Sequence, residues 1–237
     1  MPDAFSLPSA ALAIDRLPVA VIGAGRWGSH LIRQFLDQPR SQLVAVAEPN
    51  RDLWAAASQR YGDRPGWSAV AWLAEGQAAI ARDDVAAVVI ATPATTHVDL
   101  VTAALKAGKH VLVEKPLTID PAEGDRLCAL ARSVDRLLMV DHTYLFHPAI
   151  ERGQAVVDRG QSGGQLGRIY QGYAARTHLG PVRPDVDALW DLAIHDLAIF
   201  NAWLGETPIA VAARGQSWLQ DGLADLVWLD LRYPSGV

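Results

Sequence analysis

The chain has 237 residues, half of them hydrophobic, which is enough to bury the core of two modest domains or one large one. Its formal net charge is −5 and its pI is about 5.8, and it has no block of basic residues, so nucleic acid is not an expected partner. The N-terminus lacks the pattern of a signal peptide, and no apolar run is long enough to span a membrane. A cytoplasmic protein with no membrane partner is expected, and its single cysteine excludes an internal disulfide.

The first predicted elements are a strand, a glycine-rich turn and a helix. Residues 18–23 form an apolar run typical of a buried strand, and the pattern Gly-x-Gly-x-x-Gly follows at Gly23, Gly25 and Gly28. Apolar residues at one-turn spacing predict a helix over 26–38. Gly23 permits a tight turn, Gly25 leaves room for a pyrophosphate, and Gly28 lets the helix pack closely against the sheet. The positive end of the helix dipole suits phosphate groups.

An acidic residue completes this dinucleotide-binding pattern. A second strand is predicted over 43–48, and its last residue, Glu48, lies 20 residues after Gly28, as expected of a ribose-binding carboxylate. Glu48 favours NAD because it would repel a 2′-phosphate, whereas Arg51 could accommodate that phosphate and keeps NADP open. The alternative is a strand–turn–helix unit whose glycines serve only packing. The cofactor contacts predicted in this region are Gly23, Ala24, Gly25, Arg26, Trp27, Gly28, Glu48 and Arg51.

Alternating helices and strands continue to about residue 142. Helices are predicted over 50–61, 74–82, 95–107 and 121–134, and strands over 85–91, 110–113 and 137–140, with a short strand or turn at 67–72. The run 85–91 is apolar without alternation, as in a strand buried on both faces. Repeated βα units of this length predict an α/β fold with a parallel, doubly wound Rossmann sheet, which forms a dinucleotide-binding domain over residues 1–142.

After residue 142 the pattern changes, and residues 143–237 are expected to form a partial α+β domain for the substrate and for oligomerisation. The predicted elements are helices over 148–159 and 188–204 and strands over 168–176, 209–219 and 224–233. These strands would form a mostly antiparallel sheet. A turn signal at 234–236 comes one residue before the chain ends, so the sheet is expected to be truncated, with an open edge. A homo-oligomer that associates through this sheet would cover the edge.

Two motifs follow strands of the predicted parallel sheet. Ala91-Thr92-Pro93 ends the strand 85–91, and Glu114-Lys115-Pro116 comes directly after the strand 110–113. Ligands of an open α/β sheet bind beyond the carboxyl ends of its strands, so both motifs are expected to contact the cofactor. Lys115 is then a catalytic candidate in the cleft. The alternative is a solvated lysine whose ion-pair partner is Glu114.

The helix predicted over 95–107 begins beside the first of these motifs. Thr95 or Thr96 is expected to cap it. His97, in its first turn, is either a surface residue or a further cofactor contact.

A carboxylate and an imidazole occur together on the helix predicted over 188–204. Asp191 and His195 are four positions apart, hence on one face of a helix. Histidine is the natural proton acceptor when an alcohol is oxidised near neutral pH. The alternatives are a histidine that is merely paired with a carboxylate one turn away, and a metal site. No metal is expected, because no third ligand at suitable spacing is evident.

Four motifs together resemble the glucose–fructose oxidoreductase/inositol dehydrogenase (Gfo/Idh/MocA) family from about residue 17 to the end of the chain. They are Gly23-Ala-Gly-Arg-Trp-Gly28, Ala91-Thr-Pro with His97, Glu114-Lys-Pro116 and Asp191-x-x-x-His195. The segments 141–149 and 185–196 look most like members that oxidise nucleotide-linked sugars, such as UDP-N-acetylglucosamine-type 3-dehydrogenases. The chain departs from such relatives at His147, where they suggest asparagine, and family members usually continue for roughly another hundred residues.

The resemblance implies an NAD(P)-dependent oxidoreductase that acts on a CH–OH group of a sugar, most closely a nucleotide sugar. Lys115 would hold and polarise the sugar hydroxyl, His195 would take its proton, and Asp191 would bind a sugar hydroxyl or orient His195. The implied substrate contacts are Tyr144, Arg176 and Arg183, the arginines binding a diphosphate. The alternatives are an inositol or diol dehydrogenase and a cofactor-binding, catalytically weak regulatory or partner subunit.

Overall fold

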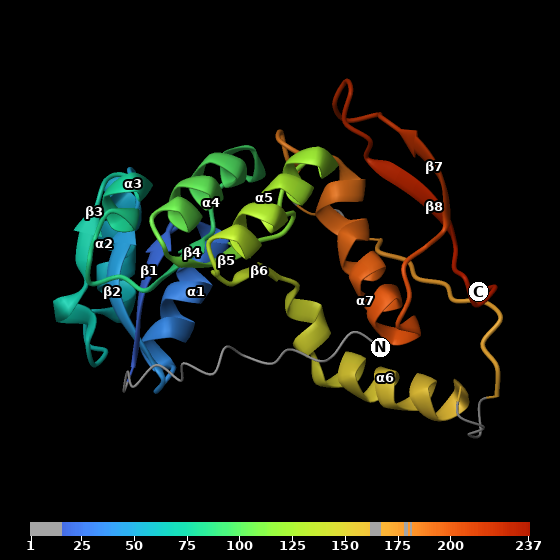
Figure 1. Ribbon diagram of the computed structural model, residues 1–237. Coiled ribbons are helices and arrows are strands. Elements are labelled where there is room, and N and C mark those ends of the chain that lie inside the picture. Colours follow the sequence, from blue (N-terminus) through green and yellow to red (C-terminus); the bar gives the residue numbers. More distant parts are fainter. Residues whose placement is uncertain (1–15, 162–166, 178–179, 181) are drawn as a thin grey trace.

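The computed structural model describes residues 16–161, 167–177, 180 and 182–237 (Figure 1). Its N-terminal part is built on a six-stranded parallel sheet in the order β3-β2-β1-β4-β5-β6. The strands are β1 (Leu17–Ile22), β2 (Ser41–Ala47), β3 (Ala71–Leu73), β4 (Ala87–Ile90), β5 (His110–Glu114) and β6 (Leu138–Asp141). The strand order changes direction between β1 and β4, which confirms the predicted doubly wound Rossmann sheet.

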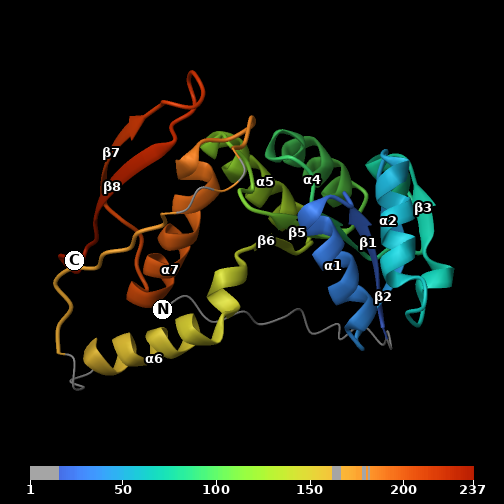
Figure 2. The same ribbon diagram turned by 180° about the vertical axis from the view of Figure 1, so that it is seen from behind.

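Helices cover both faces of this sheet. The opposite views of Figures 1 and 2 show α1 and α2 on one face and α4 and α5 on the other. The bounds are α1 (Arg26–Asp37), α2 (Arg51–Tyr61), α3 (Gly76–Ile80), α4 (His97–Lys106) and α5 (Pro121–Ser133), with 3₁₀ turns at Trp67–Ala69 and Ala94–Thr96. The predicted order of elements is therefore confirmed up to β6. The segment expected to be a strand or a turn is a 3₁₀ turn followed by β3.

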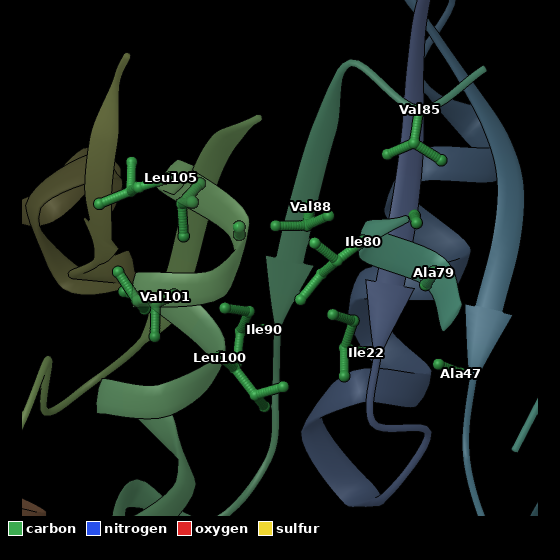
Figure 3. Packing of buried hydrophobic residues seen from close by; sticks show 14 of the residues in the cluster. Ile22, Ala47, Ala79, Ile80, Val85, Val88, Ile90, Leu100, Val101 and Leu105 are labelled. Carbon is green, nitrogen blue, oxygen red and sulfur yellow. The ribbon is translucent and has the colours of Figure 1, made fainter. Parts of the chain in front are cut away.

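Strand β4 explains why an apolar run without alternation was informative. Val88 and Ile90 point into a layer that includes side chains of α3 and α4, part of which Figure 3 shows. Ala87 and Val89 belong to the opposite layer, with Ile32 of α1. A strand that is covered on both faces needs an apolar side chain at every position, and each fully buried one contributes about 1.5–3 kcal/mol.

The second part of the chain is smaller and more open. It consists of a 3₁₀ turn (Thr143–Phe146), α6 (Pro148–Gln161), a π-helical turn (Leu189–Ala193), α7 (Ile194–Leu204), β7 (Ala210–Gln216) and β8 (Leu226–Arg232). The antiparallel hairpin β7–β8 confirms two of the three predicted strands. Both views show α7 between this hairpin and the parallel sheet. The predicted turn after β8 is confirmed, because the Gly236 N–H donates to the Tyr233 carbonyl.

The third predicted strand, 168–176, is wrong. The described residues 167–176 pair with no strand, and Tyr170 and Tyr173 are 74% and 87% exposed. This segment lies against α7 instead, where a Cβ on Gly172 would come within 2.7 Å of the Phe200 ring. Alternation predicts an extended backbone but does not show that the segment has a strand partner, and here residues 170–175 are all exposed. Every residue of β7 is exposed, and in the described residues β7 pairs only with β8.

His147 directly precedes α6, and its contact explains the departure from asparagine. Its carbonyl accepts the N–H groups of Ile150 and Glu151, and its Nδ1 accepts the N–H of Ala149 at 3.1 Å. This is the hydrogen bond that an asparagine N-cap makes to the second residue of a helix. None of the helices in the described parts of the chain is long and apolar enough to cross a membrane.

Replacement of His147 tests this capping role. We expect His147→Ala to lower the free energy of unfolding by about 1 kcal/mol, because the N–H of Ala149 loses its acceptor. His147→Asn should keep wild-type stability, since the amide oxygen can accept the same N–H. Urea denaturation followed by circular dichroism measures both changes. Equal stability of the alanine and asparagine variants would contradict the cap.

Candidate active site

The three glycines of the turn between β1 and α1 meet different surroundings. Gly23 has a φ of 95°, and a Cβ on it would come within 2.6 Å of the Ala91 carbonyl oxygen. A Cβ on Gly28 would lie 2.0 Å from the carbonyl oxygen of Gly23. Around Gly25, a Cβ would meet no atom of the described chain within 4 Å. Packing of the chain therefore requires two of the glycines, while the third leaves open the space in which a pyrophosphate could approach the backbone.

This open space lies at the N-terminus of α1. Gly25 is the N-cap residue, and no side chain caps the N–H groups of the first turn. Such N–H groups together with the helix dipole suit a phosphate, so the residues present fit a dinucleotide. Arg26 and Trp27 follow directly and are both exposed, beside the place where the phosphates would lie.

Glu48 holds the glycine-rich turn in place. Its carboxylate accepts the Ala24 N–H at 2.8 Å and the Asn50 N–H at 2.9 Å, and the residue is only 8% exposed. An ionised carboxylate has about four acceptor positions, so this arrangement leaves capacity for ribose hydroxyls. Arg51 is exposed at the start of α2, with its guanidinium 6.0 Å from the centre of the Trp54 ring.

The segment after β4 packs against this turn, and the Ala91 N–H donates to the Ile22 carbonyl. The hydroxyls of Thr92 and Thr96 share a hydrogen bond of 2.6 Å. The expectation that a threonine caps α4 is wrong for Thr96, the N-cap residue, because its hydroxyl donates backward to the Pro93 carbonyl. The threonine pair thus stabilises the segment itself and not the helix.

His97 is buried beneath the segment that follows β4 and is not a surface residue. The residue is 1% exposed, with Nδ1 2.8 Å from the Pro116 carbonyl oxygen and Nε2 3.0 Å from that of Thr92. Burial lowers its pKa, although the two carbonyls oppose the shift. The ring therefore joins the two predicted cofactor segments, and the position of Lys115 depends on it through the neighbouring Pro116.

Lys115 links the parallel sheet to the second part of the chain. Its Nζ donates to the Asp191 carbonyl at 2.7 Å and to Asp191 Oδ1 at 2.8 Å. Burial alone would raise the pKa of Asp191, but the hydrogen bond from Lys115 and the charges of Lys115 and Arg183 outweigh burial and lower it. Asp191 lies on the π-helical turn just before α7, a feature that often marks functional sites.

His195 lies one turn further along, in the first turn of α7. It is 8% exposed, and the centre of its ring is 4.7 Å from that of Tyr144 in an edge-on contact. Its pKa falls to about 4, chiefly through burial, with further contributions from the charges of Lys115 and Arg176. His195 is therefore neutral at pH 7 and can accept a proton.

The two arginines predicted to contact the substrate are already paired with carboxylates. Arg176 donates to Asp196 at 2.9 Å, and its guanidinium lies 4.4 Å from the centre of the Tyr144 ring. Arg183 makes two hydrogen bonds to Asp185, at 2.9 and 2.6 Å, and a longer one of 3.3 Å to Asp191. The structure thus brings Lys115 and Arg183 each into contact with Asp191, while the Tyr144 ring lies between the Arg176 guanidinium and the His195 ring.

Sequence reasoning missed two residues beside Lys115, namely Asp141 and His142. Asp141 ends β6 and is the register partner of Glu114 at the end of β5. Burial, followed by the charge of Asp141, raises the pKa of Glu114 to about 8. The rule that picked out Glu114, which places ligands at the carboxyl edge of a parallel sheet, could have found Asp141 as well.

A cavity of about 360 Å³ lies next to Tyr144 and Arg176. Aromatic and apolar side chains form most of its wall, with Asp196, Ile199, Phe200 and Trp203 contributed by one face of α7. Its size is at the lower end of the range of ligand pockets. In the described parts of the chain, no group of three or more His, Cys, Asp or Glu side chains could hold a metal ion.

The fold and this geometry are those of a Rossmann-type dinucleotide-binding domain. Residues 17–142 match the Gfo/Idh/MocA family, described as an oxidoreductase family with an NAD-binding Rossmann fold. The chain belongs to this family, and the resemblance seen in its motifs is confirmed.

Individual relatives cover most of this chain but only part of their own length. UDP-N-acetylglucosamine 3-dehydrogenase of Acidithiobacillus ferrooxidans is 32% identical over 216 residues, which are 89% of this chain and 62% of that protein. Inositol 2-dehydrogenase of Rhizobium meliloti is 30% identical over 213 residues, or 86% and 60% respectively. The crystal structure of GenD2 from gentamicin A biosynthesis, in complex with NAD, has a TM-score of 0.75 at 25% identity and covers 97% of this chain and 66% of that one. The chain therefore spans about 60% of the length of these two curated relatives.

A pair of glycine variants tests the open space over the turn. We expect Gly25→Ala to fold as the wild type but to bind NADH about tenfold more weakly, because its methyl group projects into the space left for the pyrophosphate. Gly28→Ala should lower the melting temperature, since its Cβ would lie 2.0 Å from a carbonyl oxygen. NADH fluorescence titration and thermal melting separate the two effects. Wild-type affinity in Gly25→Ala would refute the assignment.

Proposed function

We propose that this protein is an NAD(P)-dependent oxidoreductase that acts on a secondary alcohol of a sugar, and most specifically of a nucleotide sugar. The observation that carries this proposal is the contact between Lys115, at the carboxyl edge of the cofactor-binding sheet, and Asp191, one turn before a buried, neutral His195. These groups come from the two proposed domains, 1–142 and 143–237. The division gives the first domain the cofactor and the second most of the substrate contacts.

Each of the three side chains has a property that suits alcohol chemistry. Two of the three N–H donors of Lys115 go to Asp191, which leaves one to hold and polarise a substrate hydroxyl. Asp191 stays ionised because its neighbours lower its pKa, so it keeps Lys115 in place. His195 accepts the hydroxyl proton, because burial and nearby cations keep its ring neutral above about pH 4.

The cofactor fits the turn between β1 and α1. When bound, the nicotinamide supplies the chemistry that the side chains lack, namely acceptance of a hydride from the substrate carbon. Glu48 favours NAD, since its buried carboxylate would repel a 2′-phosphate. Arg51 keeps NADP as the second choice, because it is exposed three residues further on.

The substrate class rests on the cavity and on the relatives. The cavity beside Tyr144 and Arg176 has room for the rest of an elongated substrate whose sugar lies at Lys115. One relative is a dehydrogenase of a UDP-linked sugar, and another oxidises inositol, which is the second candidate class.

We also propose that the protein is a cytoplasmic homo-oligomer. The cytoplasmic location is proposed because the proposed cofactor and substrate are both nucleotides. Association through the C-terminal hairpin is proposed because every residue of β7 is exposed.

Turnover by a lysine variant tests the reaction. We expect the wild type to reduce NAD with at least one of a panel of UDP-sugars, inositols and hexoses, and Lys115→Met to lower kcat/KM by roughly 10²–10⁴-fold. The variant should still bind NADH, because Arg183 continues to pair with Asp191. Lys106→Met, at the exposed end of α4, is the matched control and should keep full activity.

Unchanged turnover in Lys115→Met would disprove the assigned chemistry. Binding of NADH without turnover of any compound in the panel would instead support the catalytically weak subunit.

A pair of neighbouring alanines tests the cavity as part of the substrate site. Ala174 lines the cavity, whereas the adjacent Ala175 does not. We expect Ala174→Leu to raise KM for a nucleotide sugar about tenfold, because the larger side chain fills space that the substrate needs, with KM for NAD unchanged. Ala175→Leu should leave both constants as they are. Steady-state kinetics measure KM in both variants. Equal KM values for the nucleotide sugar in the two variants would show that the substrate binds outside this cavity.

A further inference from the structure

The orientation of the His195 ring needs a structural explanation. A histidine that acts as a base is usually oriented by a hydrogen bond at one of its ring nitrogens. His195 Nδ1 is buried, but it has no hydrogen-bond partner in the described part of the chain. This nitrogen therefore does not fix the ring, and other contacts of the imidazole have to do so.

The ring of Tyr144 makes such a contact. Its centre lies 4.7 Å from that of the His195 ring, with an angle of 64° between the two planes. Aromatic rings attract each other in this edge-on arrangement, because the positive edge of one meets the negative face of the other. Tyr144 is 40% exposed, so burial alone does not hold it against His195.

Arg176 in turn holds Tyr144. Its guanidinium lies 4.4 Å from the centre of the Tyr144 ring, which is close enough for a cation–π interaction. Nε of Arg176 donates to Asp196 Oδ2 at 2.9 Å, and the side chains of this ion pair are only 22% and 23% exposed. Arg176 is therefore anchored to α7 while it lies over the aromatic ring.

These contacts form a closed series that begins and ends in the first turn of α7. Asp196 directly follows His195 in the sequence, and both belong to that turn. The series runs from Asp196 through Arg176 and Tyr144 back to the imidazole of His195. Each side chain restricts the next, so the imidazole cannot turn without loss of its contact with Tyr144.

We propose that Tyr144 and Arg176 are positioning residues, which hold the His195 ring in the orientation in which it accepts the proton of the substrate hydroxyl. The inference rests on the proposed function. It gives the two residues a role other than the substrate binding that the motifs imply. Tyr144 acts through its ring and not through its hydroxyl, and Arg176 acts through its place over that ring. A base that is already oriented needs no reorganisation when the substrate arrives.

The charge of Arg176 has a second effect on His195. Burial is the main cause of the low pKa of His195, which is about 4. Three further groups lower this pKa and one carboxylate opposes them, namely Lys115, Arg176 and His142 on one side and Asp191 on the other. Arg176 thus helps to keep the ring neutral, and removal of its charge should raise the pKa of His195.

Replacement of Tyr144 tests the aromatic contact by kinetics. We expect Tyr144→Leu to lower kcat for alcohol oxidation by about 10- to 100-fold, with a much smaller effect on KM, because the base loses its orientation. Tyr144→Phe keeps the ring and should restore most of the wild-type kcat. The matched control is Tyr170→Leu, which removes an exposed tyrosine that lies beside Arg168, and it should keep the wild-type kinetics. An equal loss of kcat in Tyr144→Phe and Tyr144→Leu, or an effect confined to KM, would show that Tyr144 binds the substrate and would overturn the inference.

The His195 ring can also be observed without turnover. In NMR spectra of the protein with labelled histidines, the resonance that is missing in His195→Gln belongs to this ring. Tyr144→Leu should shift that resonance, because the ring current of Tyr144 is lost, whereas Tyr144→Phe should leave it near its wild-type position. Arg176→Met should raise the pH at which the resonance titrates, and Arg176→Lys, which keeps the charge, should hold it near the wild-type value.

The NMR results separate two ways of being wrong. A His195 resonance that is unchanged in Tyr144→Leu, or a pKa that is unchanged in Arg176→Met, would overturn the positioning role. The expected NMR changes in a protein that turns over no compound of the panel would support the contacts of the ring and would instead refute the proposed function.

Discussion

The ion pair between Lys115 and Asp191 is the interaction on which the rest of this site depends. It joins residues 76 positions apart, one at the edge of the parallel sheet and the other on the π-helical turn before α7. Both side chains are partly buried, at 15% and 29% exposed, so each charge relies on the other for compensation. The pair also fixes the environment of His195, since Lys115 is the largest single charge contribution that keeps its ring neutral. A contact that connects the two parts of the chain thus also sets the protonation state of the candidate base.

The electrostatics of the site separate two groups that would titrate closer together in water. Burial is the main cause of both shifts: with the charges of Lys115 and Arg176 it lowers the pKa of His195 to about 4, and with the charge of Asp141 it raises the pKa of Glu114 to about 8. A pair of titratable groups whose environments push their pKa values apart is the usual basis for dividing the roles of base and acid. At neutral pH the His195 imidazole is free to accept a proton, whereas the Glu114 carboxyl already holds one. The same few side chains around Lys115 therefore create both conditions.

Much of this arrangement could be predicted from local sequence patterns, and the exceptions have physical reasons. The strands and helices up to β6 followed from periodicity, and Glu114-Lys115-Pro116 followed from the rule that ligands bind at the carboxyl edge of the sheet. The strand predicted over 168–176 was wrong because alternation indicates an extended backbone but not a strand partner, and most of these residues are exposed. The burial of His97 between two carbonyls was not predictable, because no local pattern shows how closely two loops approach. The roles of these residues in binding and catalysis stay predictions.

The pairing of the arginines limits how a nucleotide sugar can bind. Arg176 and Arg183 were expected to meet a diphosphate, but Asp196 and Asp185 already neutralise them. A diphosphate at Arg183 would also approach Asp191, since that guanidinium bridges Asp185 and Asp191. Such a ligand would have to displace a carboxylate, and like charges in a partly buried site repel strongly. The cavity beside Tyr144 avoids this cost, because aromatic and apolar side chains form most of its wall. For the nucleotide sugar proposed above, recognition of the base in such a cavity would depend on shape and stacking more than on charge.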